Sequence, residues 1–451
     1  MENKENKMGV MPEGKLLMNM SLPIMISMFV QALYNIVDSI FVARISEDAL
    51  TAVSLAFSLQ TLMIAVATGT GVGLNALVSR ALGEKKPKRA STVAQNGIFV
   101  YIVSYIVVAI VGCVAVKPFY TMQTSAGQEA IFNYGVEYLS IVMIFSFGLF
   151  MQICLERLLQ ATGRSFYTML SQTTGAVINI ILDPILIFGM CGMPAMGIKG
   201  AAIATAVGQI VAAVEALLWN ILKNHDIHLS FKGFRPNFAI IKNIYKIGLP
   251  SIVMQSIGSV MTTGMNYILM GLSSTGTAVF GVYFKLQSFF FMPIFGLNNG
   301  MIPIISYNYG ARKKSRMLNT LKYSYIVAFA FAFIGFLGFE IIPDKLLLMF
   351  DASEKMVEIG VVALRIIGIH YLIAWYCIVT GSMFQAVGKA AYSMYVSIAR
   401  QMVVLLPVAY ILAQIGGLTA IWWCFPIAEV MSMIMTIIFF GRVKKTVLNQ
   451  F

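Results

Sequence analysis

Charge is scarce in this sequence. Of its 451 residues only 11% are charged, whereas 59% are hydrophobic and the mean hydropathy is +0.81. Soluble domains carry about 25% charged residues, so the composition excludes a protein whose main solvent is water. Apolar runs of about 20 residues, long enough to cross the hydrocarbon core of a bilayer, recur along the whole chain instead.

Cysteine and histidine are scarce as well. The five cysteines are odd in number, dispersed and free of any C-x-x-C spacing, so they indicate no disulfide framework. His225 and His228 have a spacing that suits a metal, but two ligands alone do not make a site. No Walker motif is present, so we expect no cofactor and no direct use of ATP.

The apolar runs predict an all-α integral membrane protein with twelve transmembrane helices. The first fifteen residues lack a small-residue cleavage site, so the first helix is expected to stay in the mature chain. The expected helices are 16–43, 50–79, 91–116, 130–160, 165–189, 197–222, 239–270, 277–307, 317–342, 355–384, 390–413 and 417–440.

Lysine and arginine predict the orientation of these helices. Alternate loops are basic, such as those at 80–89, 223–246 and 312–322, whereas the loops between them hold only five basic residues in all. By the positive-inside rule the basic loops and both termini face the cytoplasm of a multi-pass cell-membrane protein. The net charge of +13 is spread over short loops and forms no single face, so we expect no nucleic-acid partner.

The sequence repeats itself. Residues 23–86 align with 250–313 without a gap, and 158–167 align with 383–392. Because each half has an even number of helices, the halves are parallel repeats, which predicts two pseudo-symmetric six-helix bundles. The expected parts are a cytoplasmic tail (1–15), an N-terminal bundle (16–222), a cytoplasmic linker (223–238) that joins the halves, a C-terminal bundle (239–441) and a second tail (442–451).

Two aspartates lie inside apolar helices. A charge at the bilayer centre costs roughly 2.5–3.5 kcal/mol, so an intramembrane carboxylate is a functional candidate. Asp38 and Asp183 each lie six residues before the outer end of their helix, about 9 Å deep at 1.5 Å per residue. Other acids, such as Glu156 beside Arg157, lie nearer helix ends, where snorkelling or pairing explains them.

Each aspartate belongs to a polar stripe on one helix face. The stripes are Gln31, Asn35 and Asp38 on the first helix and Gln172, Asn179 and Asp183 on the fifth. We expect the stripes to face each other and the two carboxyl groups to titrate as one coupled, proton-binding pair. The alternative is that both aspartates only hold helices together through hydrogen bonds.

Proline and the repeat add to the cation-binding interpretation. Pro184 has no N–H, so the carbonyl of Ile180 becomes a free acceptor one turn from Asp183, and the helix bends there. The repeat places Met265 and Val408 where the first half has its two aspartates. The sequence therefore predicts a cation site in the N-terminal half alone.

Three features are typical of one family: Pro23 followed by Asp38 on the first helix, the motif N-x-x-x-D-P at 179–184, and MGIKGAAIAT at 196–205. In these features the chain resembles the multidrug and toxic compound extrusion (MATE) family, and the resemblance extends over nearly its whole length. The similarity is to the branch of DinF and MepA pumps. The resemblance implies that Asp38 and Asp183 bind the coupling ion, H⁺ or Na⁺, with Gln31, Asn179 and Thr205 as neighbouring ligands. Bending is expected at Pro23 and Pro184.

The resemblance also implies a secondary active antiporter that exports lipophilic organic cations by alternating access. Thirty methionines and 12% aromatic residues suit loose recognition of such substrates. Candidate cavity residues are Asn35, Gln287, Asn298 and Asn299, and the roles of Lys285, His370 and Glu429 stay open. We expect a monomer, and the sequence does not identify any protein partner.

Two alternatives remain at this point. A flippase for a lipid-linked sugar would have the same architecture, but it calls for more intramembrane cations than Lys285, Arg365 and Arg400 provide. An intramembrane aspartyl protease also uses two membrane aspartates, yet its Tyr-Asp and Gly-x-Gly-Asp contexts are missing, so we expect no enzyme. The residues do not choose between H⁺ and Na⁺.

Overall fold

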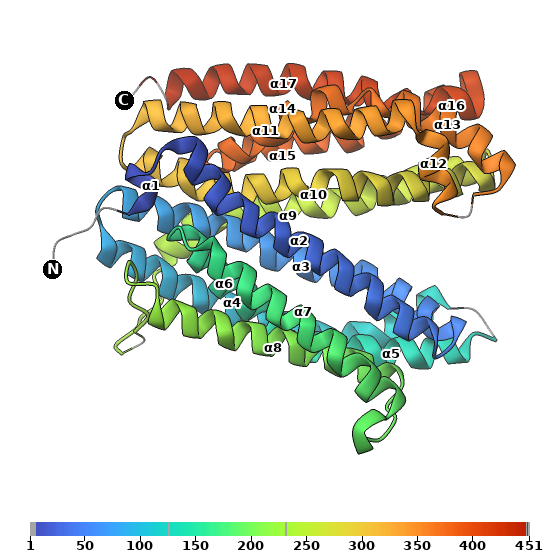
Figure 1. Ribbon diagram of the computed structural model, residues 1–451, viewed down its shortest axis with the longest axis horizontal. Coiled ribbons are helices and arrows are strands. Elements are labelled where there is room, and N and C mark those ends of the chain that lie inside the picture. Colours follow the sequence, from blue (N-terminus) through green and yellow to red (C-terminus); the bar gives the residue numbers. More distant parts are fainter. Residues whose placement is uncertain (1–5, 125–126, 231, 351, 448, 450–451) are drawn as a thin grey trace. The chain divides into compact units, whose positions relative to one another are not determined.

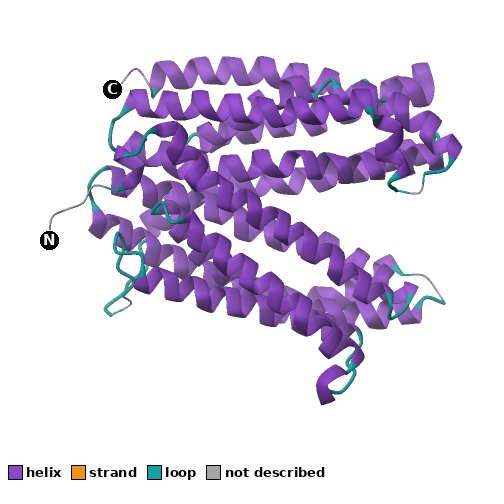
Figure 2. Cartoon of the chain, in the orientation of Figure 1, coloured by secondary structure: helices purple, strands orange, loops and turns teal. Residues whose placement is uncertain are grey.

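The computed structural model describes residues 6–124, 127–230, 232–350, 352–447 and 449, and every regular element in these ranges is a helix (Figure 2). The first half contains α1 (Lys7–Val10), α2 (Glu13–Ala43), α3 (Glu47–Gly83), α4 (Pro87–Gln123), α5 (Glu129–Ile144), α6 (Phe147–Ala161), α7 (Ser165–Phe188), η1 (Met190–Gly192) and α8 (Ile198–Leu222) (Figure 1). The second half contains α9 (Phe238–Met270), α10 (Ser274–Gly310), α11 (Lys314–Ile341), α12 (Pro343–Leu348), α13 (Glu354–Gly368), α14 (Tyr371–Ala386), α15 (Ala390–Ile398), η2 (Ala399–Leu405), α16 (Leu406–Ile421) and α17 (Cys424–Thr446).

The described helices form the twelve predicted spans. Nine stretches are long and apolar enough to cross a membrane singly, and two bent pairs, α5 with α6 and α13 with α14, each make one more. The twelfth span is α9, whose 33 residues are sufficient in length although it is less apolar.

The two halves repeat each other helix by helix. A shift of 227 positions carries the bounds of α3 onto those of α10 and the start of α4 onto the start of α11. The caps repeat too, since Ser46 Oγ accepts from Ala49 N at 3.0 Å and Ser273 Oγ accepts from Gly276 N at 3.1 Å. These serines satisfy backbone N–H groups that the first turn of a helix leaves free.

Three spans are less regular than the sequence predicts. The expected continuous helices 130–160 and 355–384 are bent by 43° and 49°, at Phe145 and Ser146 and at Ile369 and His370. The expected break between 413 and 417 is a kink at Gly417, whose φ of 62° suits glycine. In the same span, η2 is a π-helix that ends at Leu405, where α16 begins, and in this form one extra residue widens a turn.

The helices pack into two compact units. The first contains Asn6 and residues 22–248, and the second contains residues 7–21 and the chain from Leu249 onward. This division differs from the expected bundles, 16–222 and 239–441, because the start of α2 packs with the second unit and the start of α9 packs with the first.

The repeated caps give a test of helix stability. We expect Ser46→Ala to lower the free energy of unfolding by about 1 kcal/mol, because the N–H of Ala49 loses its acceptor. Ser54→Ala is the control, since the Ser54 hydroxyl only donates to the carbonyl of Leu50 in the same helix. Unfolding of the purified protein in detergent measures both, and equal stability of the two variants would contradict the assignment of the cap.

Candidate functional site

The two intramembrane aspartates of the first unit meet. Asp38 lies on α2 and Asp183 on α7, and their carboxyl groups are in hydrogen-bonding contact. Asp38 is 9% exposed and Asp183 is 0% exposed. Two negative charges that close repel strongly in a medium of low dielectric, and a hydrogen bond between two carboxyl groups needs a proton on one of them. The pair is therefore suited to hold a positive charge.

The amide of Asn179 links this pair to α8. Its Nδ2 lies 3.5 Å from Asp183 Oδ1 and 3.4 Å from the hydroxyl oxygen of Thr205. Two glycines allow the helices to come this close, because a Cβ on Gly175 would lie 2.9 Å from the carbonyl oxygen of Gly208. Small residues at a crossing of membrane helices permit such backbone approach.

Three buried oxygens around the pair have no hydrogen-bond partner among the described residues. They are Asp38 Oδ1, Asn179 Oδ1 and Asp183 Oδ2. Buried polar atoms in folded proteins nearly always have a partner, so such a group of unpaired atoms needs an explanation, for example an ion or ordered water. All three are acceptors in this arrangement. The arrangement can therefore bind a proton carried by water, or a small cation with oxygen ligands.

Two tyrosines near the aspartates were missed by the sequence reasoning. Tyr138, on α5, and Tyr34, on α2, both lie close enough to interact electrostatically with Asp38 and Asp183. The hydroxyl of Tyr138 also lies 3.4 Å from Gln60 Nε2 on α3. Tyr34 could have been found, since it lies one turn before Asp38, but Tyr138 belongs to no polar stripe.

Some residues of the two polar stripes do not lie at the aspartate pair. Gln31 is exposed and hydrogen bonds with Tyr34, and Asn35 is exposed on the same helix. Gln172 turns to a different carboxylate, donating from Nε2 to Glu156 Oε2 at 2.7 Å. Asn179 and Asp183 of α7 and Thr205 of α8 thus form the cluster without Gln172.

Glu156 is buried, and the interactions that stabilise its buried carboxylate differ from those expected. The side chain is 2% exposed and accepts hydrogen bonds from Gln152 at 3.0 Å and from Ser171 at 3.3 Å, besides the one from Gln172. The neighbouring Arg157 donates to Gln160 at 3.0 Å. Pairing does explain Glu156, but the partners are neutral side chains on α6 and α7.

The polar candidates of the second unit lie in other surroundings. Gln287 Nε2 is 3.5 Å from His370 Nε2, and Asn298 is 5% exposed with its Oδ1 unpartnered among the described residues. Glu429 accepts from Arg400 at 3.1 Å. Lys285, whose role the sequence left open, is exposed, and its Nζ lies 5.9 Å from the ring centre of Phe350.

Comparison with known proteins adds a family match. Residues 23–185 and 250–411 match the family model MatE, in agreement with the two predicted repeats. The multidrug export protein MepA of Staphylococcus haemolyticus is 27% identical over 417 residues, which cover 92% of this chain and 90% of that protein. MepA of Staphylococcus aureus (strain MRSA252) is 26% identical over 441 residues, covering 97% and 96%.

A solved structure is similar in fold. The outward-facing conformation of a multidrug resistance MATE family transporter of the MOP superfamily has a TM-score of 0.91 at 24% identity. The superposition covers 100% of this chain and 99% of the other.

The close crossing of α7 and α8 can be tested by adding one methyl group. We expect Gly175→Ala to lower the unfolding temperature, because its Cβ would press on Gly208 and Ala212 and separate Asn179 from Thr205. Gly281→Ala is the matched control, since nothing lies within 4 Å of its Cβ position. Thermal unfolding in detergent, monitored by the exposure of thiol groups, measures the stability of both variants. A Gly175→Ala protein that is as stable as the control would contradict the tight crossing.

Proposed function

The chain belongs to the MatE family, and on that premise we propose that it is a secondary active antiporter that expels lipophilic organic cations in exchange for inward H⁺ or Na⁺. The observation that carries the proposal is the buried contact between Asp38 and Asp183 beside three oxygens without partners. A carboxylate pair without a positive partner is stable inside a bilayer only when it holds a cation, so its occupancy follows the ion supply.

The transport cycle follows from this occupancy. An inward-open state takes up the organic cation, the halves then change their arrangement, and H⁺ or Na⁺ enters the aspartate pair from outside. Its binding changes the local charge by one unit next to α2, which contains Pro23 and can bend there. The bending of α2 expels the substrate, and release of the ion to the cytoplasm resets the pair.

An ion gradient is a sufficient source of energy for this cycle. When one ion enters for each monovalent organic cation that leaves, no net charge crosses the membrane, so the concentration gradient of the ion does the work. A tenfold ion gradient, worth about 1.4 kcal/mol, then supports at most an opposite tenfold gradient of the substrate. We propose that the chain uses this gradient and neither ATP nor a cofactor.

Lipophilic organic cations are the proposed substrates for two reasons. The relatives named above are called multidrug export proteins, and the chain is rich in methionine and aromatic residues, whose adaptable surfaces tolerate varied ligands. Asn35, Gln287, Asn298 and Asn299 remain the proposed polar contacts.

The proposed location is the cell membrane, with both termini in the cytoplasm. The basic loops carry this orientation, because lysine and arginine stay on the cytoplasmic side of short loops. We propose that the protein acts as a monomer without a nucleic-acid partner.

Gradient-driven uptake into inside-out vesicles tests the coupling site. A fluorescent lipophilic cation is the substrate, and a proton gradient and a sodium gradient are imposed separately. We expect wild-type uptake to respond to one of the two gradients. In Asp38→Asn and in Asp183→Asn, uptake should fall to the rate measured without a gradient, because the altered pair can no longer bind and release a cation. Asp48→Asn, which changes an exposed carboxylate on α3, should transport like wild type.

The gradient that drives wild type identifies the coupling ion. Full gradient-driven transport by both variants would show that Asp38 and Asp183 are structural, and coupling would then have to be sought near His370 and Glu429. Loss of transport in Asp48→Asn as well would mean that the substitutions act by damaging the fold.

A further inference from the structure

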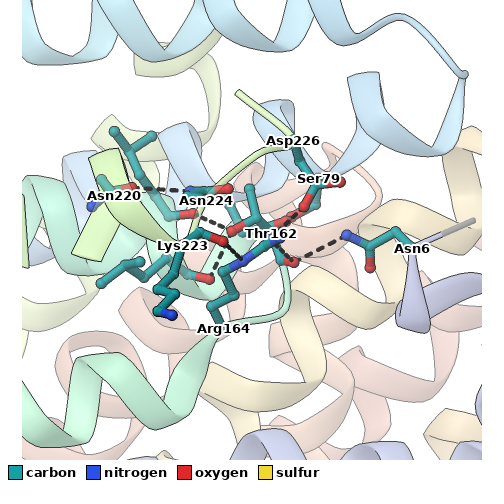
Figure 3. A network of polar contacts seen from close by, with 11 residues as sticks. Asn6, Ser79, Thr162, Arg164, Asn220, Lys223, Asn224 and Asp226 are labelled. Atoms are coloured by element: carbon teal, nitrogen blue, oxygen red, sulfur yellow. Dashed lines mark hydrogen bonds and ion pairs between the residues drawn. The ribbon is translucent and has the colours of Figure 1, made fainter. Parts of the chain in front are cut away.

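The second unit holds an ion pair inside its spans. Arg400 Nη1 lies 3.1 Å from Glu429 Oε2, and the glutamate side chain is 3% exposed. Arg400 follows the start of α15 by ten residues, which is about 15 Å along the span at 1.5 Å per residue. The pair of Arg164 with Asp226 differs, because it belongs to a network at the turn between α6 and α7, where Arg164 also donates to the carbonyl of Lys223 at 2.7 Å (Figure 3).

The first repeat has no side chain at the position of Arg400. The offset of 225, which aligns the ends of α6 and α14, carries Gly175 onto Arg400. In the first unit α7 and α8 cross closely at this glycine, since a Cβ on Gly175 would lie 2.9 Å from the carbonyl oxygen of Gly208. In the second unit Arg400 lies in the π-helix η2, a form often found at functional sites. The arginine is therefore a feature of the second repeat alone.

Glu429 lies at the other side of the same crossing. Gly197 at the start of α8 and Gly417 in α16 share an unusual backbone conformation, with φ of 54° and 62° and ψ of −131° and −147°. Eleven residues after them come Gly208 and Ala428, and Glu429 follows directly. The ion pair of the second unit thus stands where two glycines close the crossing in the first unit.

Buried oxygens without partners accompany the ion pair. Four side-chain oxygens in this region have no hydrogen-bond partner among the described residues: Glu429 Oε1, Tyr283 Oη, Ser432 Oγ and Thr436 Oγ1. Ser432 and Thr436 follow Glu429 by three and seven residues, so the three lie on one face of α17. The thiol of Cys377 on α14 is near both hydroxyl groups, but a thiol is a weak hydrogen-bonding group. Oxygens left in this way are ligands for a small cation or for water.

The titratable neighbours of Glu429 are neutral. Tyr283 on α10, His370 before α14 and Cys377 all lie close enough to interact with both charges of the ion pair. The carbonyl of Ile367 can only accept, so His370 Nδ1, which lies 2.6 Å from it, carries a hydrogen. The other ring nitrogen lies 3.5 Å from Gln287 Nε2, an amide donor, and therefore acts as the acceptor of a neutral ring. Arg400 thus supplies the positive charge that balances Glu429.

We propose that Arg400 is a tethered cation, which holds the place of an exchangeable ion at Glu429, so that the second unit exchanges no ion during transport. A guanidinium group keeps its proton in proteins, and its covalent link prevents it from leaving. The proposal rests on the antiport function proposed above and deepens it, since every coupling ion then passes through Asp38 and Asp183.

The proposal also defines a latent binding site. Without the charge of Arg400, the second unit would hold a buried carboxylate, Glu429, beside the unpaired oxygens of Ser432 and Tyr283. That arrangement resembles the aspartate pair of the first unit, and a lone buried charge is costly. The ligand that would offset this cost is a small monovalent cation, H⁺ or Na⁺.

Cation binding to the purified protein in detergent tests the proposal. Asp38→Asn and Asp183→Asn together remove the first site, and binding of radioactive sodium and uptake of protons are then measured. We expect no saturable uptake of either cation while Arg400 is present, one new site after Arg400→Gln, and loss of that site when Glu429→Gln is added. Arg365→Gln, which removes an exposed arginine of α13, is the matched control and should bind like its parent.

Two outcomes would overturn the proposal. One is uptake that persists with Arg400 in place and disappears with Glu429→Gln, because Glu429 would then exchange a cation beside the arginine. The other is a folded Arg400→Gln protein that takes up neither cation. Both are equilibrium measurements that require no transport, so a failure of the proposed antiport would appear in the vesicle assay and leave these results readable.

Chemical rescue covers the case in which Arg400→Gln does not fold. Millimolar methylguanidinium, a free copy of the lost group, is added to Arg400→Ala before purification, so the yield of folded protein is itself a result. We expect a higher yield and a higher unfolding temperature, because a ligand that binds only the folded state stabilises it. Arg365→Ala should not respond. An equal effect on both variants, or none on Arg400→Ala, would contradict the tethered cation.

Discussion

The cost of placing charge in hydrocarbon governs where this chain can put its ionisable side chains. The buried carboxylates described above differ in the interactions that offset the cost of burying their charge. Neutral donors surround Glu156, and Arg400 pairs with Glu429. The ion pairs within the described part of the chain do not include Asp38 or Asp183. We propose this pair, rather than Glu156 or Glu429, as the place where an exchangeable cation binds, because the pair has neither the ion pair of Glu429 nor the three neutral donors of Glu156.

Duplication supplied the scaffold, and the two copies have since diverged in chemistry. The halves share helix bounds, serine caps and glycines at close crossings, since each of these features depends only on backbone packing. Their buried charges differ, because Met265 replaces the aspartate in α9 and the second unit instead pairs Arg400 with Glu429. The two halves thus share a fold and differ in their buried charges, and the proposed cation site uses the charges of the first half alone.

Close glycine crossings serve two purposes in this fold. Gly175 and Gly208 bring α7 and α8 together so that Asn179 reaches both Asp183 and Thr205. Gly73 and Gly300 instead receive helix starts from the other repeat. Helices in lipid gain little from hydrophobic burial against one another, so van der Waals packing at small residues takes a larger share of the work. A methyl group at any of these positions would collide with the neighbouring helix and separate the two backbones.

The sequence by itself determined the twelve spans and the repeat, and it predicted an equal depth for Asp38 and Asp183. These features depend on hydropathy, on self-similarity and on the rise of 1.5 Å per residue, all of which are local or additive along the chain. Only the tertiary structure decided that Gln172 bonds to Glu156, that Tyr138 lies near the aspartates and that the helix starts are exchanged. The reason is that a side chain's partner depends on which neighbouring helix crosses it and at what height, and distant residues such as Gly73 and Ile244 set that crossing.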